Sequence, residues 1–165
     1  MWWGDEDGGS SPGAWEPDIL ARRDVPTDVT MDIEGFRDGP ELDVRATVCV
    51  EFGGTSRNMR VYVAQILDHH LASIGYHRNA FRQIAIEDVW VEANSCVNVR
   101  AAMSLKAEDL SQIPDIGLVA WAQEPLATGP AETYQATYVF DPQGIGTNGL
   151  ESGDLSGWDY VTGGN

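Results

Sequence analysis

The stretch LDVRATVCVEF, residues 42–52, alternates apolar and polar side chains at every step. Successive side chains of a β-strand point to opposite faces of the sheet, so this pattern predicts a strand with one buried and one exposed face. The side chains expected to face the core are Leu42, Val44, Ala46, Val48, Val50 and Phe52. This is the strongest strand signal in the chain.

Similar patterns recur on both sides of this strand, separated by Gly, Pro and Asp turns such as Gly35–Pro40 and Gly53–Ser56. No stretch shows a helical stripe over three turns, and Glu108–Leu110 reads as a loop or a single helical turn. The sequence therefore predicts an all-β fold, an antiparallel two-sheet sandwich of the immunoglobulin or fibronectin kind, with a barrel as the alternative. Parallel α/β folds lack their crossover helices here. The further strands are expected at 29–33, 59–67, 84–91, 97–105, 116–123 and 133–140.

The 165 residues suit one domain with two arms. We expect an acidic and aromatic N-terminal arm at 1–25, the sandwich at 26–142, and a Gly-, Asp- and Ser-rich C-terminal arm at 143–165. Large aromatic side chains are unusual in segments that stay in water, so these arms are expected to lie against a surface of their own domain or of a partner chain. The aromatic residues assigned to this interaction are Trp2, Trp3, Trp15, Trp158 and Tyr160.

The formal net charge is −16, from 26 acidic and 10 basic residues. Affinity for nucleic acid comes largely from cations that displace counterions, so a nucleic-acid partner is excluded, and docking on anionic lipid is disfavoured. No apolar run approaches the ~20 residues of a membrane-spanning helix.

Two cysteines, Cys49 and Cys96, lie 47 residues apart with no CxxC pair and no histidine at zinc-finger spacing. Each falls on the less apolar face of an expected strand. Two interpretations remain open: a disulfide on the outer side of a sheet, which is favoured, or two inert buried thiols.

Candidate chemistry is sparse. One cluster carries metal-ligand side chains, and a polar network at a strand end is the simpler interpretation of it. Its members are Asp68, His69, His70, His77 and Glu87. No serine lies in a nucleophile elbow, and no glycine-rich phosphate loop is present. The acidic run from Asp5 does not match the EF-hand pattern. Loose calcium binding by the acidic arms remains an open alternative, and no other cofactor is expected. We therefore expect no enzymatic activity.

Three aromatic residues, Tyr62, Trp90 and Trp121, lie opposite apolar neighbours on their strands. Because one face of each strand is the core, these rings are expected to cover the outer face or to cap the edge of the sandwich. Such rings stack on sugars in some β-sandwiches. Cover by the aromatic arms is the favoured interpretation.

Two strings carry a resemblance to a known family: VYVAQILDHHLASIGYHRNAFRQ at 61–83 and LVAWAQEPLATGPAETYQAT at 118–137. They resemble the C-terminal β-sandwich half of proteins related to a twenty-eight-kilodalton bacterial outer-membrane antigen, including its H-x-x-x-x-R element at 77–82 and its E-x-x-Q-A element at 132–136. Those proteins commonly place a thioredoxin-like domain before this half, and it is absent from the present sequence. The resemblance implies export and an adhesive or structural task, without redox activity.

The segment NGLESGDLSGW, residues 148–158, is similar to one common in secreted bacterial proteins. We therefore expect an extracellular, cell-surface or periplasmic protein, although the N-terminus lacks the pattern of a signal peptide. A processed fragment of an exported precursor would explain both features.

The expected function is that of a non-catalytic structural or interaction protein, a subunit of a homo- or hetero-oligomer held together by its aromatic arms. The alternative is a carbohydrate-binding module that uses Trp90, Trp121 or Trp158, with calcium as a possible stabiliser. A metal-dependent enzyme at His69, His70 and His77 is the third hypothesis.

Overall fold

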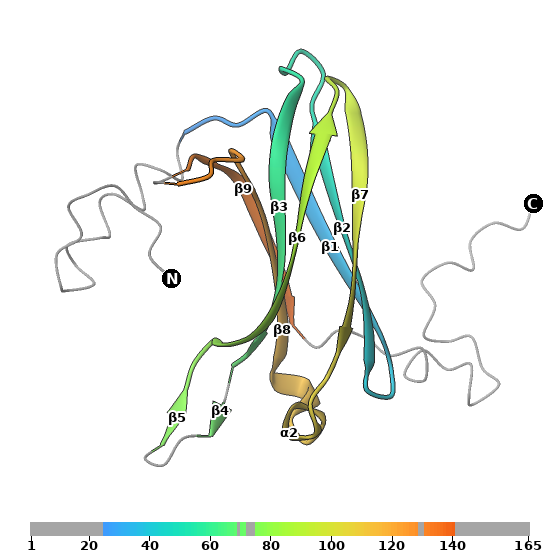
Figure 1. Cartoon of the computed structure of the whole chain (residues 1–165), viewed down its shortest axis with the longest axis vertical. Helices are drawn as coiled ribbons and strands as arrows, with labels where there is room; N and C mark the ends of the chain where they lie inside the picture. The colour runs from blue at the N-terminus through green and yellow to red at the C-terminus, as the bar shows by residue number, and fades with distance from the viewer. Residues whose placement is uncertain (1–24, 69, 72–74, 129–130, 141–165) are drawn as a thin grey trace, which may run out of the picture.

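A computed structural model describes residues 25–68, 70–71, 75–128 and 131–140. Two antiparallel sheets pack face to face as a sandwich (Figure 1). The first sheet has three strands in the order β1-β2-β7, and the second has four in the order β6-β3-β8-β9. Their bounds are β1 Val29–Asp38, β2 Glu41–Val50, β3 Arg57–Leu67, β6 Ala80–Val91, β7 Ser95–Ser104, β8 Ile116–Gln123 and β9 Thr133–Phe140.

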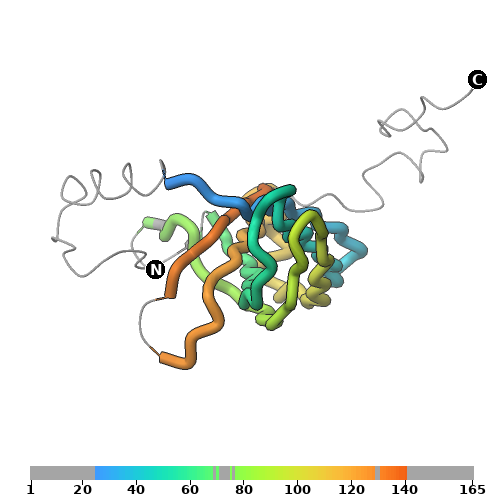
Figure 2. Tube along the Cα trace, turned by 90° about the horizontal axis from the view of Figure 1, so that it is seen from above, coloured from blue at the N-terminus to red at the C-terminus, as the bar shows by residue number. Residues whose placement is uncertain are grey.

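The edges of the two sheets lie beside each other. β1 contacts β9 along one side of the sandwich, and β6 contacts β7 along the other. In the view from above, the described residues between β8 and β9, 124–128 and 131–132, project from one side of the body (Figure 2). The all-β two-sheet prediction is confirmed.

The core lies between the inward faces of the two sheets. Every second residue of β2 is buried, and the same alternation runs through β7. Complete burial of an aliphatic side chain contributes about 1.5–3 kcal/mol, so this double layer is the main source of stability. The largest fully buried apolar side chains are Leu42, Met59, Leu67, Ile116 and Leu118.

The structure corrects two sequence predictions at the ends of strands. Gly35–Pro40 was predicted as a turn, but β1 continues through Gly35 and pairs it with Val44, so that only Gly39 and Pro40 turn the chain. Gly39 supplies the positive φ that this tight turn needs, at +57°. Phe52 was predicted to face the core, but β2 ends at Val50 and Phe52 is 89% exposed.

The irregular stretch after β3 contains a short hairpin, β4 His70–Leu71 paired with β5 Tyr76–His77. Sequence periodicity did not reveal this hairpin, because two-residue strands are too short to show a period. The single helical turn expected near Glu108 is present as α2, Ala107–Leu110, followed by a 3₁₀ turn at Ile113–Asp115.

α2 lies at the end of the four-stranded sheet (Figure 1). A buried polar network holds it there. The Gln65 side chain on β3 is fully buried and donates from Nε2 to Oδ2 of Asp109, 3.3 Å away. On β6, Gln83 donates to Oε1 of Gln65 at 2.5 Å, and Nε of Arg82 lies 2.8 Å from Oδ1 of Asp109. Buried polar groups are tolerated when they are paired in this way, so the network fixes α2 in place.

Candidate interaction surface

The outer faces of the two sheets differ in chemistry. The outer face of the three-stranded sheet is polar: Arg45 pairs with Glu34 at 2.5 Å, and the Thr47 hydroxyl donates to Oδ1 of Asn98 at 2.8 Å. Polar side chains on one face and apolar ones on the other are typical of an antiparallel sheet with one face in water.

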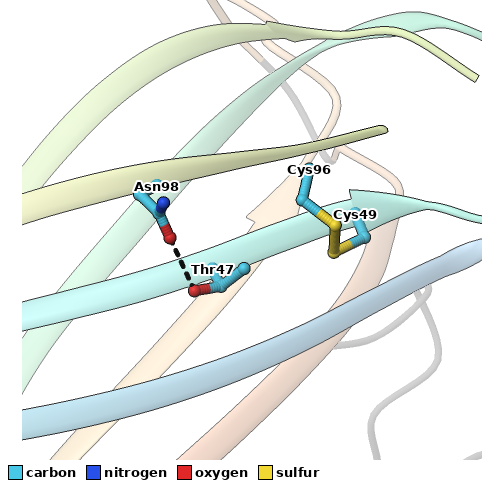
Figure 3. The surroundings of a disulfide bond; sticks show 4 residues. All are labelled: Thr47, Cys49, Cys96 and Asn98. Carbon is cyan, nitrogen blue, oxygen red and sulfur yellow. Dashed lines mark hydrogen bonds between the residues drawn. A yellow bond between two sulfur atoms is a disulfide. The ribbon is translucent and has the colours of Figure 1, made fainter. Parts of the chain in front are cut away.

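Cys49 and Cys96 form a disulfide on this polar face (Figure 3). They lie directly opposite each other in the register of β2 and β7, with their Cα atoms 4.0 Å apart. Thr47 and Asn98 form the next outward-facing pair along the same two strands (Figure 3). The predicted disulfide on the outer side of a sheet is confirmed, and the alternative of two buried thiols is wrong.

The outer face of the four-stranded sheet is apolar. Strand register places its outward side chains in three rows that each cross all four strands. We call these twelve residues the apolar face. From β6 to β9, row one is Phe81, Ile66, Gly117 and Phe140; row two is Ile84, Ala64, Val119 and Tyr138; and row three is Ile86, Tyr62, Trp121 and Ala136.

The edge strands of the apolar face carry its exposed side chains. Five of the ten large hydrophobic residues exposed in the described part of the chain lie here. Their exposed fractions are 55% for Phe81, 36% for Ile84, 56% for Ile86, 69% for Tyr138 and 42% for Phe140. Contiguous apolar surface of this kind marks an interaction site more often than scattered exposed residues do.

A polar row borders the apolar face beyond row three. Arg60 on β3 donates to both carboxylate oxygens of Asp88 on β6, at 2.7 and 2.8 Å. This hydrogen bonding holds the pKa of the Asp88 carboxyl below its usual range. The charges of this row therefore neutralise each other, and the apolar face itself contains no charged side chain.

The middle of row three is formed by a stacked aromatic pair. The rings of Tyr62 and Trp121 are nearly parallel, with centroids 4.6 Å apart. Nε1 of Trp121 donates to Oε1 of Gln123 at 3.1 Å, and the Trp121 side chain is 4% exposed. Trp121 is therefore a structural part of the face, whereas Trp90, two positions beyond Asp88 on β6, is 54% exposed.

In row one, Gly117 on β8 makes a close contact with the side chains of Phe140 on β9 and Ile66 on β3. A Cβ built on Gly117 would lie 2.7 Å from Cε1 of Phe140 and 2.8 Å from Cγ1 of Ile66. Only glycine leaves room for this arrangement. The Phe140 ring thus lies over the backbone of β8 and continues the apolar surface across that strand.

The structure describes four of the residues in the histidine cluster: Asp68, His70, His77 and Glu87. His70 and His77 are register partners in the β4–β5 hairpin, and Asp68 forms an ion pair with Arg78 at 2.6 Å. His69 lies outside the described residues. Within the described part of the chain, no three His, Cys, Asp or Glu side chains gather as a metal site would require.

The arm residues Trp2, Trp3, Trp15, Trp158 and Tyr160 lie outside the described residues. No helix in the described part of the chain is both long and apolar enough to span a membrane.

The strand order and packing define an immunoglobulin-like antiparallel β-sandwich. No protein-family model matches the sequence, and no curated protein matches it. Among solved structures, the chain is similar to HBP35 of Porphyromonas gingivalis, with a TM-score of 0.62 and 9% identity, over 78% of this chain and 45% of HBP35. It is also similar to a domain of the outer-membrane lipoprotein Omp28 from the same organism, with a TM-score of 0.50 and 16% identity, over 73% of this chain and 94% of that domain.

These similarities show a shared fold, and the chain spans less than half of HBP35. The shared fold agrees with the β-sandwich expected from the sequence. A further match, to part of a β-glucosidase from Kluyveromyces marxianus, has a TM-score of 0.41 and carries no argument about activity.

Proposed function

We propose that this protein is a non-catalytic structural or interaction component of the bacterial cell exterior and a subunit of a larger assembly. The observation that carries the proposal is the apolar face. It leaves five large hydrophobic side chains in contact with water on a protein whose net charge is −16.

The contrast between the two outer faces supports an interaction role. Both sheets pack on the same core, yet only the four-stranded sheet turns hydrophobic side chains outward in contiguous rows. Burial of apolar surface is the main driving force of protein association. A surface of this kind is stabilised by a partner that covers it.

The location outside the cytoplasm is supported by the disulfide between Cys49 and Cys96. Disulfides persist in oxidising compartments and are rare in the bacterial cytosol. The similar Omp28 domain comes from an outer-membrane lipoprotein, which is consistent with the same location.

The aromatic arms supply side chains suited to such contacts. Trp2, Trp3 and Trp15 precede the sandwich in sequence, and Trp158 and Tyr160 follow it. Aromatic residues contribute large contact area at small cost in conformational entropy, and they are enriched where proteins associate. In our proposal these arms join neighbouring subunits.

Light scattering of the full chain and of a chain that lacks residues 1–25 tests the proposal. We expect the full chain to assemble and the shortened chain to form a lighter assembly, with an unchanged far-ultraviolet β spectrum. A full chain that stays monomeric at every concentration would overturn assembly. An unchanged oligomer mass after the deletion would overturn the role of the N-terminal arm.

A second candidate is carbohydrate binding, and the specific observation in its favour is the exposed indole of Trp90. A glycan array, followed by titration of any hit against Trp90→Ala, tests it. Loss of binding in the variant would support a sugar platform, and an array without hits would contradict one. Repeating the titration with calcium and with a chelator tests the proposed calcium dependence.

A further inference from the structure

We infer that the apolar face of one copy binds the C-terminal segment, residues 141–165, of a neighbouring copy. This inference rests on the proposed function, because it names the surface and the segment through which the subunits associate.

The size of the apolar face suits a segment of chain better than a second folded domain. Four strands about 4.8 Å apart and three rows about 6.8 Å apart, with their side chains, give roughly 20 by 20 Å. This projected area of about 400 Å² is about half of the ~800 Å² that each partner buries in a standard protein interface. An extended segment needs less width, so it can cover the face on its own.

The chemistry of the C-terminal segment also fits. Its 25 residues contain no Lys, Arg or His, so no cation has to be desolvated on a face that offers no partner for one. Six large apolar or aromatic residues are spread along it: Ile145, Leu150, Leu155, Trp158, Tyr160 and Val161. Apolar side chains spaced by Gly, Ser and acidic residues can contact the face while the acids stay in water.

The direction of β9 favours a neighbouring copy as the recipient. The strand runs from Ala136 in row three, through Tyr138 in row two, to Phe140 in row one. At Phe140 the chain is therefore leaving its own apolar face and heading away from rows two and three. An adjacent copy related by a twofold axis receives this segment and returns its own, so both faces are covered by reciprocal exchange.

Analytical ultracentrifugation of full-length variants tests the inference. The face variant carries Ile86→Ser and Tyr138→Ser, and the segment variant carries Leu155→Ser and Trp158→Ser. The control is Phe36→Ser, which removes an exposed ring, 42% exposed, from the outer face of the other sheet. We expect the dissociation constant of the assembly to rise at least tenfold in both test variants and to change less than twofold in the control.

Mixing the two test variants gives the decisive result. The segment variant retains an intact face and the face variant retains an intact segment, so a mixed pair keeps one of its two exchanged contacts. We expect the mixture to associate more tightly than either variant alone.

The other outcomes overturn the inference and separate it from the proposed function. If both test variants associate like the unmodified chain while loss of residues 1–25 abolishes assembly, the C-terminal segment is not the occupant and the proposed function stands. If the mixture associates no more tightly than either variant alone, the inference that neighbouring copies exchange their C-terminal segments is wrong. If the unmodified chain is monomeric at every concentration, both proposals fail.

Discussion

The ring of Phe140 on β9 lies over Gly117 on β8, its cross-strand partner, so closely that a Cβ on the glycine would come within 2.7 Å of the ring. The contact places an aromatic side chain against the β8 backbone at the point where β9 ends. It joins the two strands at row one of the apolar face and connects the packing of the sheet to the surface we propose for association.

Gly117→Ala therefore displaces the Phe140 ring and Cγ1 of Ile66. We expect a loss of about 1 kcal/mol in the free energy of unfolding, the lower end of the range for overpacking, because both neighbours are side chains and the Phe140 ring is free to move toward solvent. Urea denaturation measures the change. The same substitution made in a Phe140→Ala background should cost less than half as much, and an equal cost in both backgrounds would show that the ring is not responsible.

Trp121 and Trp90 form a matched pair of indoles on the same sheet. Trp121→Ala removes a ring that is stacked on Tyr62 and almost completely buried, so we expect a loss of about 3–4 kcal/mol in the free energy of unfolding. Trp90→Ala removes a largely exposed ring and should cost less than about 1 kcal/mol. Denaturation curves of the two variants compare them directly. Equal losses would contradict the placement of Trp121 in the structure.

The disulfide is expected to add stability without defining the fold. Replacing Cys49 and Cys96 by serine removes a link across 47 residues, which corresponds to a loss of about 3–4 kcal/mol in the chain-entropy model. β2 and β7 remain paired along the rest of their register, so the β spectrum should be unchanged. A variant as stable as the unmodified protein, or one without β structure, would contradict this expectation.

Acid should weaken the protein through two paired carboxylates. Hydrogen bonds from Arg82 lower the pKa of Glu108, and hydrogen bonds from Arg60 lower the pKa of Asp88. A carboxyl group whose pKa is lower in the folded state stabilises the fold above its unfolded pKa, about 4 for these groups, and loses that contribution as the pH falls toward the folded value. Stability should therefore be constant near pH 7 and decline below about pH 4.

Glu108→Gln should make that decline shallower, as measured by urea midpoints between pH 7 and pH 3. Glu51→Gln, in the exposed turn after β2, controls for the change in net charge. Identical pH profiles for Glu108→Gln and the unmodified protein would show that the Arg82 pair does not contribute.

The strands and the disulfide were predictable because they depend on local patterns. The apolar run at 116–123 and the segment at 133–140 were predicted as strands with the bounds that β8 and β9 have. The polar surroundings of Cys49 and Cys96 indicated that both lie on an outer face. The turn at Gly35–Pro40 and the burial of Phe52 were predicted wrongly. In each case the local composition was ambiguous, and pairing with the neighbouring strand decided where the strand ended.

The apolar face could be predicted only in part. Tyr62, Trp90 and Trp121 were expected at the outer surface or the edge, but the apolar run at 59–67 indicated only that this strand is central in its sheet, as β3 is. The rows appear only when register brings Phe81, Ile66 and Phe140 together from distant parts of the sequence. The burial of Asp109 was equally hidden, because its partners Gln65 and Arg82 lie on other strands.

Hydroxyl-radical footprinting of the assembled full chain, read by mass spectrometry, tests the central claim that the apolar face is covered in the native protein. Phe52 and Phe36 serve as internal standards, because both are exposed and lie away from the face. We predict that Tyr138, Phe81 and Phe140 are oxidised several-fold more slowly than the rates expected from their exposed fractions in the isolated sandwich. Oxidation of these three rings in proportion to that exposure, relative to the two standards, would contradict the account.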